Sequence, residues 1–276
     1  MECKLRAEDT LLNYALFMPS EIRLLSTDFD GTIVCRTGEP FLDVDCMKLI
    51  QELQKQGAMW AINTGRSVDL LESGLLDFSF PYRPDFILTS ERDVFRPGSN
   101  GSKWEAFGDW NDRCAREHAT LFTSATSVLK QVIEFVNQKT KARIIYEADS
   151  PAGLIASSEE EMQRISEFID AAREQEPKFH YQRNTVYLRF CHIDYHKGAV
   201  LGELARLLEL PRENIFAAGD NHNDLSMLDG RFAGLPACPA NAVAEVKDTV
   251  RQAGGYIARK DCGAGVHEAL LQFLQN

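Results

Sequence analysis

Two carboxylates stand one residue apart in the stretch Leu24-Leu25-Ser26-Thr27-Asp28-Phe29-Asp30-Gly31-Thr32. The apolar run just before them predicts a buried strand, because turn residues follow it directly. Residues two apart in an extended chain point the same way, so Asp28 and Asp30 can face one site. Parallel sheets bind ligands outside the carboxyl ends of their strands. Two close carboxylates repel each other unless a cation joins them, and their hard oxygen atoms suit Mg²⁺.

Taken alone, this pair of carboxylates is better explained as a solvated turn, since Asp and Gly are common turn residues. Three further polar clusters favour chemistry: Asn63-Thr64-Gly65-Arg66, Lys197-Gly198 and Gly219-Asp220-Asn221-His222-Asn223-Asp224. The first and the last of them follow apolar stretches that are typical of strands. Each cluster also has an ordinary explanation, as a helix cap, a surface lysine or a polar turn. The functional interpretation therefore depends on their combination.

In this order, the four clusters resemble the four signature motifs of the haloacid-dehalogenase-type phosphatases. The resemblance covers the chain except for residues 1–20, and it is closest to the Cof-type and sucrose-phosphatase-like subgroup. In that subgroup a large cap is inserted between the second and third motifs. Asn241-Ala242, shortly before Val246-Lys247, is similar to a further segment of the subgroup. The resemblance implies an α/β fold with a doubly wound, Rossmann-like parallel-sheet core and an inserted α+β cap domain.

The resemblance also implies a role for each acidic residue. Asp28 would be the nucleophile that forms an aspartyl-phosphate, and Asp30 would act as general acid and then as general base. In the family, Mg²⁺ is held by residues that match Asp28, the backbone carbonyl of Asp30, and Asp220. Asp224 matches a residue that orients the metal ligands from behind.

Other matched positions would bind the phosphate group or the rest of the substrate. A hydroxyl and a backbone N–H at a helix N-terminus form a natural anion site, and a lysine supplies positive charge. The residues in these roles are Thr64, Gly65, Lys197 and Asn223 for phosphate, with Arg66, Tyr187 and Arg189 as candidate substrate contacts.

Strands and helices alternate at the start of the chain and again after Cys191, which is the pattern of a parallel α/β sheet. The middle of the chain breaks this rhythm with long helices and short strands that have a mixed core of their own. We therefore assign residues 1–93 and 191–276 to the catalytic core and residues 94–190 to the inserted cap, which would set substrate specificity. Residues 1–20 form an N-terminal extension, in which Leu11, Leu12, Ala15, Leu16 and Met18 have helical spacing.

The segment from Thr185 to Phe190 alternates cleanly between apolar and other residues. Val186, Leu188 and Phe190 are expected to pack against cap helices, which leaves Tyr187 and Arg189 facing the other way, towards the site. The alternative is an ordinary solvated sheet face.

A departure from the family pattern follows the third predicted strand. Related proteins often carry Ser-Asn-Gly-Ala there, whereas this chain reads Thr89-Ser90-Glu91-Arg92-Asp93. Charged residues at that place would alter the pocket or the cap hinge. The substrate of a relative therefore does not transfer directly to this chain.

Composition excludes several classes of partner. The net charge of −11 and the absence of a basic stripe argue against nucleic-acid binding, and no apolar run reaches membrane-spanning length. The seven cysteines are odd in number and none are spaced as Cys-x-x-Cys, which favours reduced thiols and a cytoplasmic protein. The expected partner is a small phosphorylated molecule. The sequence does not indicate an oligomeric state.

These observations predict a Mg²⁺-dependent phosphomonoester hydrolase that acts on a small phosphorylated metabolite, a sugar phosphate, through an aspartyl-phosphate. One alternative is a phosphotransferase similar to phosphomannomutase, since such relatives have similar caps. Another is a sugar-phosphate-binding regulator without catalysis, which the presence of both Asp28 and Asp30 disfavours. The chain contains neither a Gly-x-Ser-x-Gly elbow nor a Gly-rich loop ending in Gly-Lys-Ser/Thr, which argues against serine hydrolases and ATP-dependent kinases.

Overall fold

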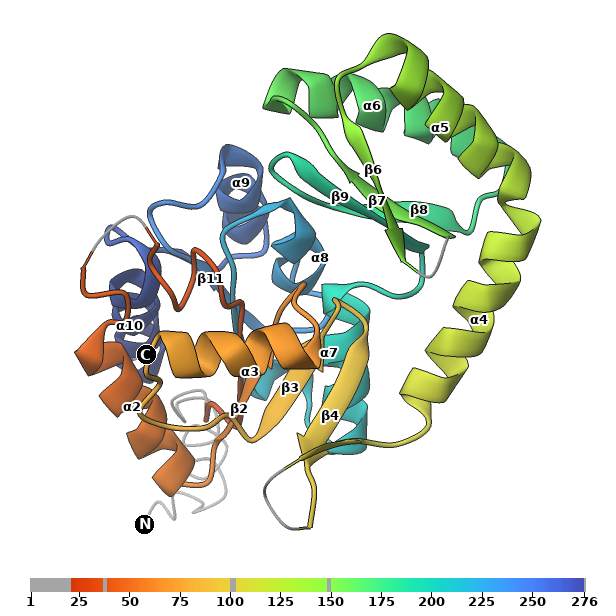
Figure 1. Cartoon of the computed structure of the whole chain (residues 1–276). Helices are drawn as coiled ribbons and strands as arrows, with labels where there is room; N and C mark the ends of the chain where they lie inside the picture. Colours follow the sequence, from red (N-terminus) through yellow and green to blue (C-terminus); the bar gives the residue numbers. More distant parts are fainter. Residues whose placement is uncertain (1–20, 37–38, 100–102, 148–149, 276) are drawn as a thin grey trace, which may run out of the picture.

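The computed structural model of the chain describes residues 21–36, 39–99, 103–147 and 150–275. The helix expected between Leu11 and Met18 lies outside these residues. Figure 1 shows two units, a larger core that holds the C-terminus and a smaller cap above it. Among the described helices, none combines the length and apolar character needed to cross a bilayer.

The core is built on an eight-stranded sheet in which β1 lies between β10 and β2 and runs parallel to both. Six neighbouring strands of this sheet are parallel, while β4 and β5 extend one edge as antiparallel strands. In sheet order the strands are β12 (Tyr256–Ile257), β11 (Leu235–Cys238), β10 (Ile215–Ala218), β1 (Leu24–Thr27), β2 (Met59–Asn63), β3 (Phe86–Thr89), β4 (Asp93–Pro97) and β5 (Trp104–Ala106).

Helices cover both faces of the core sheet, as expected for a doubly wound fold. Successive residues of β1 point to opposite faces of the sheet, and both are apolar. Leu24 packs into the apolar cluster on one face and Leu25 into the cluster on the other, so each face needs a layer of helices to cover it. The side chain of Asp43 caps the first of these helices by accepting a hydrogen bond from the N–H of Cys46 at 2.7 Å. The helices are α2 (Val44–Lys55), α3 (Val68–Asp77) and α10 (Cys262–Gln275) on one face, and α7 (Lys197–Leu207), α8 (Leu225–Leu228) and α9 (Ala244–Gln252) on the other.

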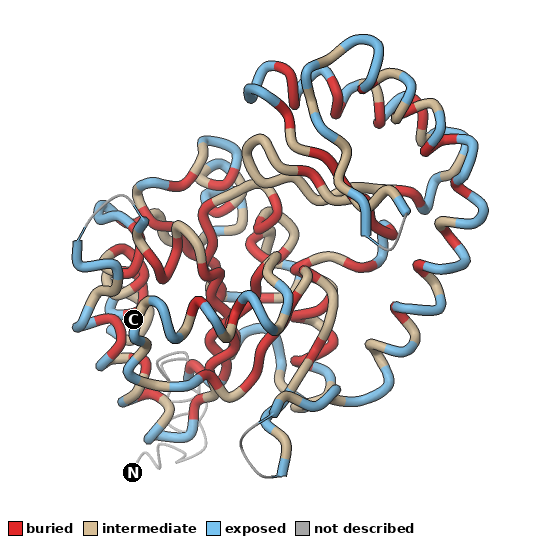
Figure 2. The backbone as a smooth tube through the Cα atoms, in the orientation of Figure 1, coloured by how far each residue is buried: buried red, intermediate tan, exposed pale blue. Residues whose placement is uncertain are grey.

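The cap is a four-stranded antiparallel sheet with two helices on one face. Leu188 and Phe190 are buried among these helices and Val186 packs against them, which confirms their predicted direction. The other face of the sheet is turned towards the core (Figure 1), and Figure 2 shows many half-buried residues along its strands, beside buried and exposed ones. The cap elements are α5 (Thr126–Lys139), β6 (Arg143–Glu147), β7 (Ser150–Ile155), α6 (Glu159–Ala172), β8 (Phe179–Asn184) and β9 (Tyr187–His192), and α4 (Trp110–Ser124) leads into them from the core.

The expected boundary between core and cap at residue 94 falls inside β4. Strands β4 and β5 pair with the core sheet, and the apolar cluster of the cap includes residues only from Leu121 to Phe190. We therefore propose that the cap begins with α4. The hairpin of β4 and β5 was missed because its strands are short and carry charged residues, so they lack the apolar run of a central parallel strand.

The parallel strands bring their carboxyl ends to one edge of the core sheet, and this edge faces the cap. Asp28 follows β1 directly, Thr64 follows β2, and Asp220 lies two residues after β10. The polar clusters predicted from the sequence therefore lie together at the carboxyl ends of the parallel strands, which is where open α/β sheets bind their ligands.

Candidate active site

The centre of the site is a lysine between two aspartates. The Nζ of Lys197 donates to Oδ1 of Asp28 at 2.6 Å and to Oδ1 of Asp224 at 2.7 Å. Lys197 is fully buried, although lysine is usually solvated, and Asp28 is only 6% exposed. A buried charge of this kind is tolerated only when it is paired, so the three residues form one unit.

The start of α7 holds Lys197 in this place. His196 caps the helix, because its Nδ1 accepts the N–H of Ala199 at 3.1 Å. A Cβ on Gly198 would lie 2.1 Å from the carbonyl oxygen of Ser226, so only glycine lets α7 approach this close. Burial opposes the charged form of Lys197, but Asp224 and Asp28 outweigh it and raise the pKa of the lysine. Lys197 therefore remains a cation.

Asp220 completes the acidic cluster from the end of β10. Its Oδ1 accepts the hydroxyl hydrogen of Thr32 at 2.8 Å. Gly31 has φ +84°, and a Cβ there would lie 2.5 Å from Oδ2 of Asp220. Both its conformation and its missing side chain therefore let the loop after β1 pack against this carboxylate.

The acidic cluster carries more negative than positive charge. One oxygen each from Asp28, Asp220 and Asp224 lies within 4.8 Å of the others, against the single cation of Lys197 in the same network. Burial and the neighbouring Asp224 raise the pKa of Asp220 to about 7, and burial raises that of Asp28 well above its ordinary value. A divalent cation would relieve this repulsion, and the oxygen donors suit Mg²⁺.

Asp224 differs from the other two carboxylates because both of its oxygens are engaged by the protein. Its Oδ2 accepts the backbone N–H groups of Asp220 and Asn221, each at 2.9 Å, while Oδ1 accepts Lys197. These bonds fix the loop that carries Asp220. The arrangement supports the expected role of Asp224 behind the metal ligands rather than as a ligand itself.

Asp30 points to a different set of partners. Arg66 donates to both of its oxygens, from Nε at 2.7 Å and from Nη2 at 2.9 Å, and Arg36 adds an ion pair at 2.9 Å. The guanidinium of Arg66 also stacks on the ring of Phe29, 4.6 Å from its centroid. Arg66, a candidate substrate contact, is therefore engaged by Asp30 in this structure. Such a bidentate pair fixes the direction of the carboxylate.

The residues predicted to bind phosphate lie next to the carboxylate of Glu91, a contact that the sequence did not predict. Thr64 and Asn223 are buried, and Nδ2 of Asn223 donates to Oε1 of Glu91 at 2.7 Å. Glu91 also lies over Gly65, because a Cβ there would be 3.3 Å from Oε1. The amide of Asn223 is thus held by Glu91 at the edge of the predicted phosphate site.

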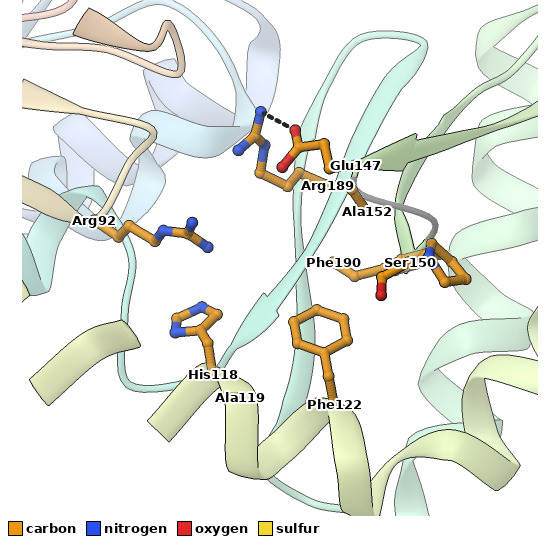
Figure 3. A pocket seen from close by; sticks show the side chains of 10 residues that line it. Arg92, His118, Ala119, Phe122, Glu147, Ser150, Ala152, Arg189 and Phe190 are labelled. Atoms are coloured by element: carbon orange, nitrogen blue, oxygen red, sulfur yellow. Dashed lines mark ion pairs between the residues drawn. The ribbon is translucent and has the colours of Figure 1, made fainter. Parts of the chain in front are cut away.

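The cap contributes Tyr187 and Arg189 from β9, which are half-buried. They alternate with Leu188 and Phe190, which pack among the cap helices, so they lie on the opposite face of the sheet. Arg189 of the cap and Arg92 of the core both line a cavity of about 200 Å³, and Figure 3 shows their side chains. Arg189 pairs with Glu147 at 3.4 Å. His118 and Phe122 of α4 form another wall. The cavity offers hydrogen-bond donors, an acceptor and an aromatic surface.

Sequence reasoning did not assign Thr32, Arg36 or Glu91 to the site. Thr32 lies four residues after Asp28, so its place in the same loop was a usable signal. Glu91 was visible as a departure from the family pattern, but its contact with Asn223 joins residues 132 positions apart and cannot be read from local pattern. No sequence signal indicated the pair between Arg36 and Asp30.

Two curated proteins show partial similarity to the chain. It is 26% identical to the glucosylglycerol-phosphate synthase of Pseudomonas anguilliseptica over 253 residues, which cover 91% of this chain and 30% of that protein. It is 31% identical to the phosphoglycolate phosphatase of Methanosarcina acetivorans over 80 residues, which cover 29% of this chain and 32% of that protein. The matched regions thus span about a third of these relatives.

Solved structures share the fold at low sequence identity. The sucrose-phosphatase of Synechocystis sp. PCC6803 superposes on this chain with a TM-score of 0.68 at 16% identity. The superposition covers 92% of this chain and 98% of the sucrose-phosphatase chain. A haloacid dehalogenase-like hydrolase protein of Bacillus subtilis has a TM-score of 0.59 at 16% identity, with coverages of 98% and 99%. These similarities establish a common architecture of core and cap.

The family comparison covers the greater part of the chain. The haloacid dehalogenase-like hydrolase family matches residues 75–270, a range that contains Lys197, Asp220 and Asp224. The aspartates after β1 lie before this range, yet the fold brings Asp28 into contact with Lys197. The chain therefore belongs to the haloacid dehalogenase-like hydrolases.

Proposed function

We propose that this protein is a Mg²⁺-dependent phosphomonoester hydrolase that acts on a sugar phosphate through an aspartyl-phosphate intermediate. The observation that carries the proposal is the buried network of Asp28, Lys197 and Asp224 with Asp220 beside it. Such a network is costly to bury and is unusual without a charged ligand to complete it.

Asp28 is the nucleophile in this proposal. One of its oxygens attacks the phosphorus, the bond to the leaving oxygen breaks, and the phosphoryl group is transferred to the carboxylate. The attacking group must be ionised, which burial opposes. Lys197, 2.6 Å away, stabilises the charged form and neutralises part of the charge that develops on the phosphoryl group.

Asp30 serves as the proton donor and acceptor. It protonates the leaving oxygen and later takes a proton from the water that hydrolyses the aspartyl-phosphate. Its side chain is about a third exposed, so substrate can reach it. Catalytic hydrogen bonds often form fully only in the complex with substrate. We therefore expect Asp30 to turn from Arg66 towards the leaving oxygen when substrate binds, which would loosen the ion pair between Asp30 and Arg66.

The phosphate group is bound by side chains and backbone from three segments. Thr64 offers a hydroxyl and Gly65 a backbone N–H after β2, while Lys197 and Asn223 approach from α7 and from the loop after β10. These donors converge where the parallel strands end. They hold the phosphorus in line with Asp28.

The metal site fits Mg²⁺ by the chemistry of its donors. Asp28 and Asp220 would hold the ion together with the backbone carbonyl of Asp30, and Asp224 would orient them through its bonds to the loop. When bound, the ion would offset the repulsion between the carboxylate and the phosphate.

The cap supports a hydroxylated leaving group. The cavity of Figure 3 is lined by the hydrogen-bond donors Arg92 and Arg189, by the acceptor Glu147 and by the ring of Phe122. Such a mixture suits a sugar, whose hydroxyl groups both donate and accept. Two proteins similar to this chain carry a sugar compound in their names, the glucosylglycerol-phosphate synthase and the sucrose-phosphatase, which supports the same class of substrate. Tyr187 and Arg189 are the proposed contacts.

Phosphate release from a panel of sugar phosphates tests this function. The panel is run with Mg²⁺, after chelation with EDTA, and with the Asp28→Asn variant. We expect metal-dependent release that the substitution abolishes, with a preference among the sugars. Release from none of the compounds by folded protein would contradict the proposal. Transfer of phosphate to a sugar monophosphate in place of water would identify a mutase instead.

A further inference from the structure

The tip of the hairpin of β8 and β9 has a conformation that its first residue disfavours. A loop of two residues joins the strands, because Asn184 ends β8 and Tyr187 begins β9. Thr185, the first residue of this loop, has a φ of 52°. Glycine is the usual residue where the first position of such a loop has a positive φ, and a β-branched residue there is an outlier. Strained backbone that persists in this way is typical of functional sites.

Hydrogen bonds to the core hold this strained residue. The N–H of Thr185 donates to Oδ1 of Asn221 at 3.3 Å, and Nδ2 of Asn221 donates to the hydroxyl oxygen of Thr185 at 3.1 Å. The hydroxyl hydrogen of Thr185 is directed to Oδ1 of Asn184 at 3.3 Å, so the oxygen presents a lone pair to Asn221. Glycine would relax the backbone but would lose the second bond to Asn221. The contact with the core therefore accounts for the threonine.

Asn221 belongs to the loop that carries the proposed metal ligand Asp220. Its backbone N–H and that of Asp220 both donate to Oδ2 of Asp224, each at 2.9 Å. Oδ1 of Asn221 also accepts the N–H of His222 at 2.9 Å, at the start of the short helix η3 (His222–Asp224). The backbone of Asn221 is thus part of the acidic network, while its side chain contacts the cap.

The tip lies at the far end of β9 from the linker that leads back into the core. Strand β9 has six residues, which span about 20 Å, and α7 of the core follows it. Figure 1 shows the hairpin of β8 and β9 above α8, and β8 lies against η3. Rotation of the cap about this linker would displace the tip more than the rest of β9. The bonds of Thr185 therefore depend on whether the cap is docked.

We propose that Thr185 is a positioning residue that latches the cap to the metal loop, so that cap docking and Mg²⁺ binding strengthen each other. With the cap docked, Thr185 holds the side chain of Asn221, and Asn221 holds the loop in which Asp220 faces the ion. When the cap leaves the core, the loop loses this support and Thr185 is free to relax. This inference rests on the proposed function in that the ion is Mg²⁺, but it concerns binding and not turnover.

Binding of Mg²⁺ in the absence of substrate tests the inference. Its affinity is measured by calorimetry for the wild type, Thr185→Val and Thr185→Ser. Valine keeps the β-branched shape and the N–H but leaves Nδ2 of Asn221 without its partner. Mg²⁺ should therefore bind about 5-fold more weakly, the worth of one hydrogen bond. Serine keeps the hydroxyl and should bind Mg²⁺ within about 2-fold of the wild type. Thr123→Val removes a hydroxyl that donates to the carbonyl of Ala119 within α4, and it serves as the matched control with no expected change.

Hydrogen exchange measures the same coupling from the side of the cap. In the wild type, Mg²⁺ should slow exchange at the N–H of Thr185 by a similar factor, because coupling between two binding events is reciprocal. Mass spectrometry of the peptide that spans the tip records this protection. Thr185→Val should reduce the protection, and Asp220→Asn, which removes a proposed metal ligand, should abolish it.

An unchanged Mg²⁺ affinity in folded Thr185→Val would overturn the inference, as would exchange at the wild-type tip that does not respond to Mg²⁺. The exchange measurement uses the wild type, so it decides the question if Thr185→Val does not fold. Coupling between Mg²⁺ and the tip without hydrolysis of any phosphomonoester would refute the proposed function and leave this inference standing. Hydrolysis without coupling would do the reverse. A wild type that binds no Mg²⁺ would contradict both.

Discussion

The core side and the cap side of the site are built in opposite ways. On the core side, Lys197 is fully buried and is held by two aspartates at 2.6 and 2.7 Å. On the cap side, the side chain of Arg189 is 19% exposed and its partner Glu147 is 58% exposed, at a distance of 3.4 Å. The three residues on the core side are desolvated and joined by short hydrogen bonds, whereas the pair on the cap side is partly solvated and more widely separated.

This difference separates two tasks. Charges that must stabilise a reacting phosphoryl group act most strongly where water is excluded and nothing needs to reorganise. Contacts that select a leaving group work at a surface that opens to admit it. We therefore expect substitutions in the core to affect every substrate, and most substitutions on the cap to affect only some.

The largest effect should come from Asp28→Asn, which removes the nucleophile and nearly preserves its shape. We expect kcat to fall by at least about 10⁴-fold for all substrates, as for other nucleophiles that act as part of a unit. Circular dichroism would confirm that the variant is folded. A loss of less than tenfold in steady-state phosphate release would exclude Asp28 as the nucleophile.

Lys197→Met should damage both activity and folding. It leaves Asp28 and Asp224 buried without their shared cation, which should lower the free energy of unfolding by about 3–5 kcal/mol. Loss of charge stabilisation should lower kcat by about 100-fold or more. Denaturant unfolding and phosphate release measure the two effects. Lys48→Met, at a side chain that is 61% exposed, should change stability by less than about 0.5 kcal/mol, and an equal loss there would contradict the comparison.

Removal of Mg²⁺ should abolish the reaction in the core and leave the substrate contacts of the cap unchanged. EDTA should abolish phosphate release and Mg²⁺ should restore it, while Asp220→Asn should raise the Mg²⁺ concentration needed by about 10- to 100-fold. Mg²⁺ should also raise the temperature of thermal unfolding, because it binds the folded state. Asp248→Asn, on an exposed part of α9, is the control. Unchanged activity in EDTA would rule out this metal site.

The smallest effect should come from Tyr187→Phe, which deletes one hydroxyl from the cap. A lost hydrogen bond is worth about 1 kcal/mol, so KM for the preferred sugar phosphate should rise by roughly 3- to 10-fold. KM for a small aryl phosphate should not change. Tyr146→Phe on the exposed side of β6 provides the control. Equal effects on both substrates would show that Tyr187 is not a selective contact.

Much of this comparison could be predicted from the sequence because local patterns determine it. Apolar runs ending in polar residues located Asp28, Thr64 and Asp220 at one sheet edge, and strict alternation gave the direction of Tyr187 and Arg189. The structure confirms the doubly wound α/β core.

What the sequence could not reveal depends on contacts between distant residues. Arg66 was expected to face substrate, but its bidentate pair with Asp30 arises from the packing of two loops after neighbouring strands. The contact of Glu91 with Asn223 likewise forms only when β3 and β10 reach the same edge. Such pairings are set by tertiary structure, and no local propensity encodes them.

The most direct test of the account is to find the phosphoryl group on Asp28. Asp30→Asn should slow hydrolysis of the intermediate, so the variant is mixed with Mg²⁺ and the preferred sugar phosphate, quenched in acid and mapped by mass spectrometry. We predict one phosphoryl group on the peptide that contains Asp28, and none when Asp28→Asn is added. A phosphoryl group on another residue, or wild-type turnover by Asp28→Asn, would contradict the account.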